Sequence, residues 1–102
     1  MPRDAVARAM ATAFVLVDAV PGMTDSVFAS LAKLQGKGLV AKEKVKSLSY
    51  DILVKVEAPD DDAIEKFIQG HLRFISGVAA VRRVKDHGSE EPQVRTAMQK
   101  LQ

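Results

Sequence analysis

One pattern of residues occurs twice in this chain. Four pairs of identical residues lie about 39 positions apart: Val15 with Val54, Val17 with Val56, Phe28 with Phe67, and Gly38 with Gly77. In each copy an apolar, β-branched run precedes a stretch with apolar residues at helical spacing, and a glycine then leads into a second β-branched run. The repeat therefore predicts a strand–helix–strand unit followed by a second copy of the same unit.

The two copies divide the chain into four strands and two helices. We expect strands over residues 12–20, 39–47, 50–58 and 78–84. The helices are marked by apolar stripes, formed in the first by Val27, Phe28, Leu31 and Leu34 and in the second by Ile64, Phe67, Ile68, His71, Leu72 and Ile75. Because crossovers are right-handed, the order βαββαβ gives a four-stranded antiparallel sheet with both helices on one face. This α+β arrangement is the ferredoxin-like fold, of the dimeric α+β barrel type.

A short C-terminal helix is expected over residues 89–101. Ser89 offers an N-cap, and Val94, Met98 and Leu101 share one side. A helix this short is marginal alone, so we expect it to dock on a neighbouring subunit, with a frayed tail as the alternative. Residues 1–102 then form a single domain with its core over about 12–86.

The predicted sheet is apolar on both faces. The first strand places Ala13, Val15 and Val17 on one side and Phe14 and Leu16 on the other. Two helices cover only one face of a four-stranded sheet, and soluble monomers rarely leave such an apolar surface exposed. We therefore predict at least a homodimer, in which two subunits pack sheet to sheet.

The balance of charge argues against nucleic-acid binding. The net charge is only +2, whereas proteins that rely on phosphate contacts usually carry a larger basic excess. The one basic cluster lacks interleaved aromatic residues for base stacking, and consists of Lys33, Lys37, Lys42, Lys44 and Lys46. Lysines on an outer strand also prevent edge pairing between sheets. We expect no direct contact with nucleic acid.

No metal, cofactor or membrane segment is expected. The chain has no cysteine, which excludes thiolate ligands and suits a reducing, cytoplasmic compartment. His71 is expected to pack in the core and His87 to be exposed, and neither has an Asp/Glu set at ligand spacing. Residues 1–23 have the outline of a signal peptide, but Asp4 and Asp18 bracket an apolar run that fits a strand better. That run is also shorter than the ~20 apolar residues of a membrane helix.

Three stretches together resemble a known family. They are AFVLVDAVPGMTDSVFASLAKL, SYDILVKVEAPDDDAIEKFI and LRFISGVAAVRRV. Their order and spacing, over roughly residues 12–86, are similar to the ligand-binding (RAM) domain of the Lrp/AsnC regulators. The resemblance implies sheet-to-sheet dimers, assembled in that family up to octameric rings, which bind amino acids or related effectors between dimers.

The resemblance also implies a ligand site at the start of the third strand. In the family a Gly-x-Tyr/Phe-Asp turn lines the effector pocket, and here Leu48, Ser49, Tyr50 and Asp51 occupy that turn. A carboxylate there suits an α-ammonium, and turn amides suit an α-carboxylate. Leu48 stands where the family has glycine, which permits a positive φ or a close backbone approach that leucine does not. The alternative is that Tyr50 and Asp51 only cap the strand and pair with a neighbouring lysine.

The fourth strand adds two candidate ligand-binding residues and one further departure. Val81 and Arg83 replace hydroxyl residues that often face the ligand in the family. Arg83 either favours an acidic ligand or fills the site and keeps it empty.

These features predict a binding module rather than an enzyme. About eleven residues precede the first expected strand, too few for a helix-turn-helix domain, so the resemblance implies a stand-alone form. We expect it to sense an amino acid and to modulate transcription through a partner, such as a full-length Lrp/AsnC regulator. Two alternatives stay open: a small enzyme of the dimeric α+β barrel type, resembling monooxygenases or isomerases, and a structural oligomer without a ligand.

Overall fold

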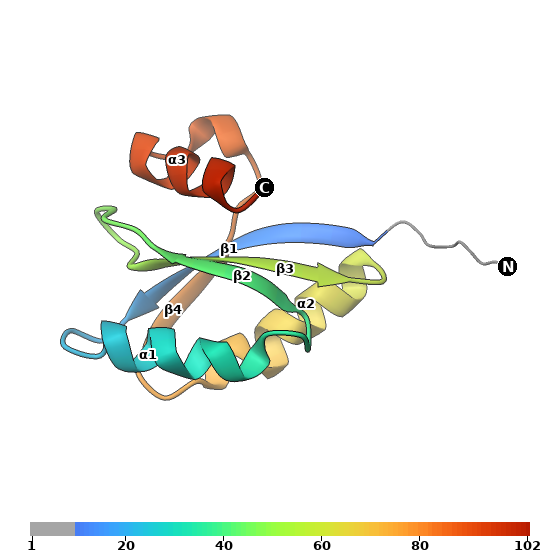
Figure 1. Ribbon diagram of the computed structural model, residues 1–102, viewed down its shortest axis with the longest axis horizontal. Helices are drawn as coiled ribbons and strands as arrows, with labels where there is room; N and C mark the ends of the chain where they lie inside the picture. Colours follow the sequence, from blue (N-terminus) through green and yellow to red (C-terminus); the bar gives the residue numbers. More distant parts are fainter. Residues whose placement is uncertain (1–9) are drawn as a thin grey trace, which may run out of the picture.

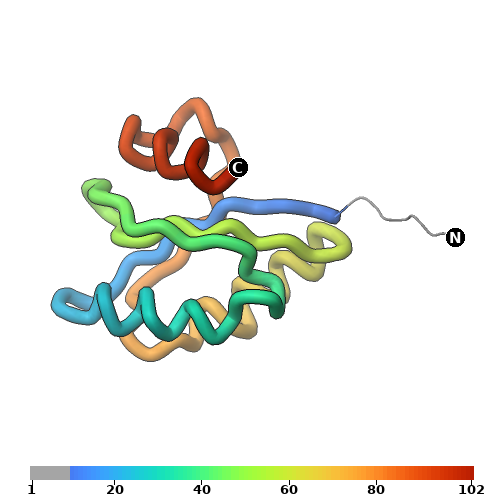
Figure 2. The backbone as a smooth tube through the Cα atoms, viewed as in Figure 1, coloured from blue at the N-terminus to red at the C-terminus, as the bar shows by residue number. Residues whose placement is uncertain are grey.

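A computed structural model describes residues 10–102 (Figures 1 and 2). Its elements in chain order are β1 (Ala11–Ala19), α1 (Thr24–Leu31), the short helix η1 (Ala32–Leu34), β2 (Leu39–Lys44), β3 (Ile52–Ala58), α2 (Asp61–Gly70), η2 (Leu72–Phe74), β4 (Val78–Arg83), η3 (His87–Ser89) and α3 (Pro92–Lys100). The expectation of a stand-alone domain rested on the segment before β1, most of which lies outside the described residues.

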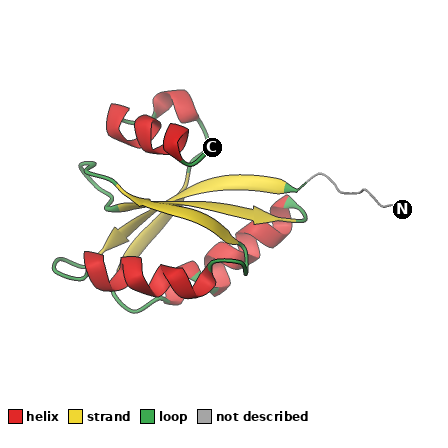
Figure 3. Ribbon diagram, in the orientation of Figure 1, coloured by secondary structure: helices red, strands yellow, loops and turns green. Residues whose placement is uncertain are grey.

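The predicted α+β fold is confirmed. The sheet is four-stranded and antiparallel, in the order β2-β3-β1-β4, so that the first strand of each repeat lies in the centre. Helices α1 and α2 both lie on one face of the sheet (Figure 3). Their apolar stripes pack on the residues of β1 and β3 that point to that face, among them Val15 and Val54, which are fully buried.

The two glycines of the repeat bring each helix close to the other half of the chain. Gly38, before β2, has φ of 130°, and a Cβ there would lie 2.9 Å from the ring of Phe67 in α2. Gly77, before β4, has φ of 94°, and its Cβ would lie 2.9 Å from Val27 in α1. A side chain at either position would be strained by the backbone and would meet a packed side chain. In each half of the repeat, therefore, the glycine before the second strand packs against the helix of the other half.

The opposite face of the sheet is covered by α3 of the same chain. Figure 1 shows α3 on the side away from α1 and α2. Val94, Ala97 and Met98 of α3 are buried against side chains on the second face of the sheet. These second-face residues are Phe14, Leu16, Leu53 and Val84, each 6% exposed or less. The argument for a dimer assumed that this face was bare, and that premise was wrong because the C-terminal helix docks on its own sheet.

Polar contacts also hold α3 to the sheet. The side chain of Lys55 in β3 donates a hydrogen bond to the carbonyl oxygen of Leu101 at 3.2 Å. Lys100 lies 3.4 Å from Glu43 in β2, although this ion pair is exposed and contributes little. The apolar contact therefore supplies most of the attachment of α3.

Four local predictions differ from the structure. The C-terminal helix begins at Pro92, not at Ser89, which belongs to η3 and does not cap α3. The third strand begins at Ile52, not at Tyr50, and the second ends at Lys44. His71, expected in the core, is exposed because α2 ends at Gly70 and the chain changes direction there. Its ring still lies 5.2 Å from that of Phe67, centroid to centroid.

The contact between α3 and the sheet predicts the effect of shortening Met98. This side chain is 3% exposed, so Met98→Ala removes buried apolar contacts and should lower the free energy of unfolding by about 2 kcal/mol. Gln99→Ala, on the exposed side of the same helix, should change it by less than about 0.5 kcal/mol. Denaturant unfolding measures both. Equal effects of the two substitutions would show that α3 does not pack on the sheet.

Candidate functional site

The turn that leads into β3 is closed by Ser47. Its hydroxyl oxygen accepts hydrogen bonds from the backbone N–H groups of Tyr50 at 2.9 Å and Ser49 at 3.3 Å. The hydroxyl also lies 3.1 Å from the carbonyl oxygen of Tyr50, to which it donates. Such bonds close a turn without a left-handed residue. No residue other than glycine has a positive φ among residues 10–102, so Leu48 replaces the expected glycine without backbone strain.

Asp51 ties this turn to the end of β1. Its backbone N–H donates to the carbonyl oxygen of Val17 at 3.0 Å. One carboxylate oxygen, Oδ2, accepts from the backbone N–H of Ala19 at 3.0 Å. The register of β1 against β4 shifts between Asp18 and Ala19, next to this contact. Asp51 therefore has a capping role at the rim of the sheet, and its second oxygen, Oδ1, accepts from no described residue.

Tyr50 is half-buried beside Arg82 of β4. The guanidinium carbon of Arg82 lies 5.3 Å from the centroid of the Tyr50 ring, within the range of a cation–π contact. The same guanidinium makes two hydrogen bonds to Glu90, at 2.8 and 3.0 Å. This bidentate pairing is the main reason that the pKa of Arg82 is raised above its usual value. The Glu90 side chain is only 9% exposed, so its carboxylate is enclosed.

A second carboxylate reaches the turn itself. The backbone N–H of Leu48 lies 3.4 and 3.3 Å from the two carboxylate oxygens of Glu91 and donates to them. The Leu48 side chain points outward and is 94% exposed. Two adjacent glutamates from the segment that leads into α3 therefore lie at the rim of the sheet near Tyr50. Glu91 accepts hydrogen bonds from the Leu48 backbone amide, and Glu90 pairs with the Arg82 guanidinium.

Val81 and Arg83 belong to the other face of the sheet. Val81 packs against the core beneath α1 and α2. Arg83 pairs with two carboxylates of α2, Asp61 at 2.5 Å and Glu65 at 2.8 Å. Successive residues of a strand point to opposite faces, so Arg83 lies with the helices and Arg82 lies with Tyr50.

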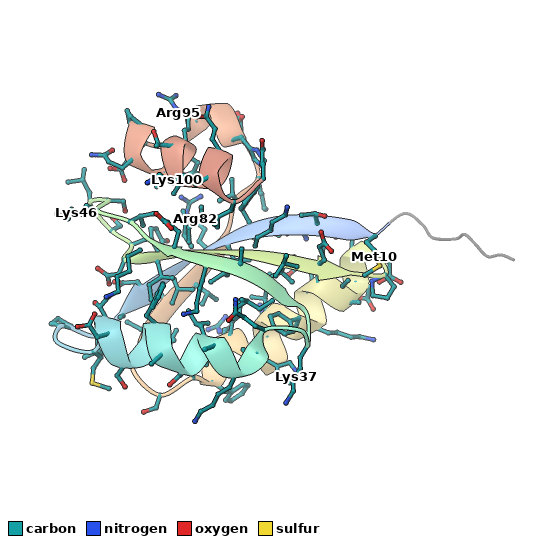
Figure 4. The ribbon with its side chains drawn as sticks, viewed as in Figure 1. Met10, Lys37, Lys46, Arg82, Arg95 and Lys100 are labelled. Atoms are coloured by element: carbon teal, nitrogen blue, oxygen red, sulfur yellow. The ribbon has the colours of Figure 1, made fainter. Side chains whose placement is uncertain are left out.

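The sequence interpretation missed Arg82, Glu90 and Glu91. Strand alternation separates Arg82 from Arg83, and this signal was present in the sequence. The two glutamates carried no such signal, because their position depends on where α3 docks. Figure 4 shows Arg82 on the side of the sheet that faces α3.

The predicted lysine cluster is divided among several contacts. Lys42 lies 3.6 Å from the centroid of the Phe28 ring, and Lys44 forms an ion pair with Asp25. Lys37 instead lines a pocket of about 440 Å³, together with Met10, Phe67 and His71. Met10 and Lys37 lie at the opposite end of the sheet from Lys46 (Figure 4). The lysines therefore do not form one continuous phosphate-binding surface.

Over residues 10–102, nowhere do three or more His, Asp or Glu side chains gather as a metal site would require. Within the same range no helix is both long enough and apolar enough to cross a membrane.

An enzyme of the dimeric α+β barrel type should have a pocket between helices and sheet. Core side chains fill most of the space between α1, α2 and the sheet. The pocket of about 440 Å³ beside His71 opens at one end of this layer, where Ala58 at the end of β3 and Phe67 of α2 are among its lining residues.

No protein-family model matches this sequence, and no curated protein matches it. Solved structures do. AsnC of E. coli aligns over 79% of this chain and 52% of its own, with 16% identity and a TM-score of 0.64. The transcriptional regulator NMB0573 of Neisseria meningitidis, solved with L-Met, aligns over 80% of this chain and 54% of its own, with 16% identity and a TM-score of 0.58. NapD of E. coli, a Tat proofreading chaperone, aligns over 82% of each chain, with 23% identity and a TM-score of 0.55.

At these identities the likeness shows the fold alone. The chain spans about half the length of AsnC and NMB0573. Regulators of the Lrp/AsnC type share its fold, which is consistent with the RAM-like domain that the sequence resembles. Of the three proteins named above, two are regulators and one is a chaperone.

The ion pairs of Arg83 predict a change in the pKa of Asp61. That pKa lies below its usual value of 3.8, chiefly because Arg83 donates a hydrogen bond to the carboxylate. A depressed folded-state pKa contributes stability above the unfolded-state value, and this contribution is lost as the pH falls through the folded-state value. Arg83→Gln should therefore raise the pKa of Asp61 towards 3.8, as measured by carboxyl ¹³C chemical shifts.

Arg82→Gln provides the matched control for this titration. Its guanidinium contacts Glu90 and Tyr50 rather than Asp61, so the pKa of Asp61 should not move. A pKa that also stays unchanged in Arg83→Gln would contradict the ion pair.

Proposed function

We propose that this chain is a small-molecule effector-binding and oligomerisation module, which senses an amino acid and modulates transcription through a partner regulator. The proposed ligand site is the rim around Leu48, Ser49, Tyr50 and Asp51. The fold shared with AsnC and with the L-Met-bound regulator NMB0573 supports this class of function. The proposal extends to this chain what is known only of those proteins.

One observation carries the proposal: the rim already holds carboxylates. The Leu48 amide donates to Glu91, which is the kind of contact that a turn amide would make to the α-carboxylate of an amino acid. The chain's own glutamate stands in for the ligand at this position. Because the Leu48 amide donates to a carboxylate without backbone strain, it is suited to donate to the carboxylate of a free ligand as well.

Asp51 supplies the opposite charge at the same rim. Its Oδ2 is engaged by Ala19, whereas Oδ1 accepts from no described residue. An α-ammonium donates three hydrogen bonds and pairs well with such a half-engaged carboxylate. Val81 and Arg83 lie on the helix-covered face, so this proposal leaves them out of the ligand site at the rim.

Assembly is the second half of the proposal. The residues beneath α3 form an apolar face that is suited to sheet-to-sheet pairing once α3 moves aside. We infer a homodimer through this face, with larger rings or mixed assembly with a full-length Lrp/AsnC regulator built from the same contact. A monomer with α3 docked is then the inactive form.

Thermal unfolding with a panel of amino acids and keto acids tests the ligand. A ligand present at 100 times its Kd adds about 2.7 kcal/mol of stability, which raises the Tm by several degrees for a domain of this size. We expect a selective rise that disappears in Asp51→Asn, because the amide keeps an acceptor for Ala19 and loses the charge. Asp62→Asn, on the exposed side of α2, should retain the full response.

No rise with any compound of the panel would contradict amino-acid sensing. An equal response in Asp51→Asn and the wild type would remove Asp51 from the site.

Releasing α3 tests the assembly. Met98→Asp places a charge in the apolar contact and should detach the helix, which exposes the second face and promotes dimers. Light scattering over a range of protein concentrations should show a higher mean mass than for Gln99→Asp, whose side chain lies on the outer side of α3. Circular dichroism confirms that the sheet persists. A folded Met98→Asp variant that stays monomeric at every concentration would contradict pairing through this face.

A further inference from the structure

We propose that Arg82 is the carboxylate anchor of the effector site, and that Glu90 is a built-in competitor which must leave Arg82 before a carboxylate ligand binds. This inference rests on the proposed function and specifies it: the ligand is a small carboxylate, and its binding loosens the segment that leads into α3.

The geometry at Arg82 is that of a formed carboxylate site. The guanidinium presents two N–H groups to both oxygens of one carboxylate, at 2.8 and 3.0 Å. This bidentate geometry is specific for planar carboxylates. The Tyr50 ring packs beside the guanidinium and restricts its orientation. β4 supplies the arginine and the β2–β3 turn supplies the ring, so the site is held by two segments of the sheet.

The occupant comes from a third segment, outside the sheet. Glu90 lies between η3 and α3, and its backbone is extended, with φ of −80° and ψ of 160°. Its side chain is 9% exposed, whereas that of Arg82 is 45% exposed. The arginine therefore remains reachable from solvent on the side that Glu90 does not cover, and an incoming carboxylate has a path to it.

Exchange of the occupant has a defined structural consequence. Glu90 and Glu91 immediately precede Pro92, the first residue of α3, and both are bonded to the rim of the sheet. A ligand on Arg82 frees the first of these attachments. The N-terminal end of α3 then keeps only the long contact between Glu91 and Leu48 and its apolar packing. Ligand binding and uncovering of the second face are thereby coupled through one arginine.

Titration with propionate, followed by NMR, tests the anchor in the full-length chain. Propionate carries only the carboxylate, and propionamide is its neutral isostere. The Nε–Hε signal of Arg82 reports occupancy, and hydrogen exchange of the α3 amides reports release. Glu90→Gln keeps the shape of the competitor and removes its charge. We expect this variant to bind propionate about tenfold more tightly than the wild type, and neither protein to respond to propionamide.

Two matched variants complete the test. Glu65→Gln alters a glutamate that pairs with Arg83 on the opposite face of the sheet and not with Arg82, so it should bind propionate as weakly as the wild type. Arg82→Lys keeps the positive charge and loses the bidentate geometry, and in combination with Glu90→Gln it should abolish the tighter binding. Equal affinities of Glu90→Gln and Glu65→Gln, or an Arg82 signal that does not move in Glu90→Gln, would overturn the anchor.

The outcome for the anchor is separate from the outcome for amino-acid sensing. If Glu90→Gln binds propionate but no amino acid shifts the Tm of either protein, the anchor stands and the proposed effector class fails. If an amino acid shifts the Tm while the Arg82 signal stays in place, the effector class stands and the anchor is overturned.

Discussion

The central strands of this protein are apolar on both faces, and every other feature of the fold follows from covering them. Val15 of β1 and Val54 of β3 face α1 and α2, while Leu16 and Leu53 face the opposite way and are equally buried. A strand that hides both of its faces must lie inside three layers. The repeat supplies two helices for one face, and the C-terminal helix supplies the third layer.

The position of α3 explains why the carboxylates of Glu90 and Glu91 lie at the rim of the sheet near Tyr50. The chain leaves β4 at an edge of the sheet and must cross to the second face before α3 begins. That crossing carries Glu90 and Glu91 past Arg82 and the turn at Leu48. Covering the sheet and filling the proposed ligand site are therefore done by the same short segment, which is why we propose that ligand binding uncovers the second face.

The sequence predicted the fold well and the site only in part. The spacing of Phe28 and Phe67, and of the glycines before β2 and β4, was enough for the βαββαβ order because periodicity reports which face of an element is buried. Tyr50 and Asp51 were predicted to open β3, but the strand begins at Ile52 and both residues belong to the turn before it. Arg83 was chosen where Arg82 is the neighbour of Tyr50, because alternation along β4 was not applied to the pair.

The sequence by itself determined the four strands, the two crossover helices and the two-sided apolar sheet. Only the tertiary structure decided what covers the second face. The spacing of apolar residues in a short amphipathic helix suits its own sheet and a neighbouring subunit's sheet equally well. The tertiary structure also decided that Glu90 meets Arg82, eight positions earlier in the chain. That contact depends on a path through space between two elements, and no local propensity or periodicity encodes such a path.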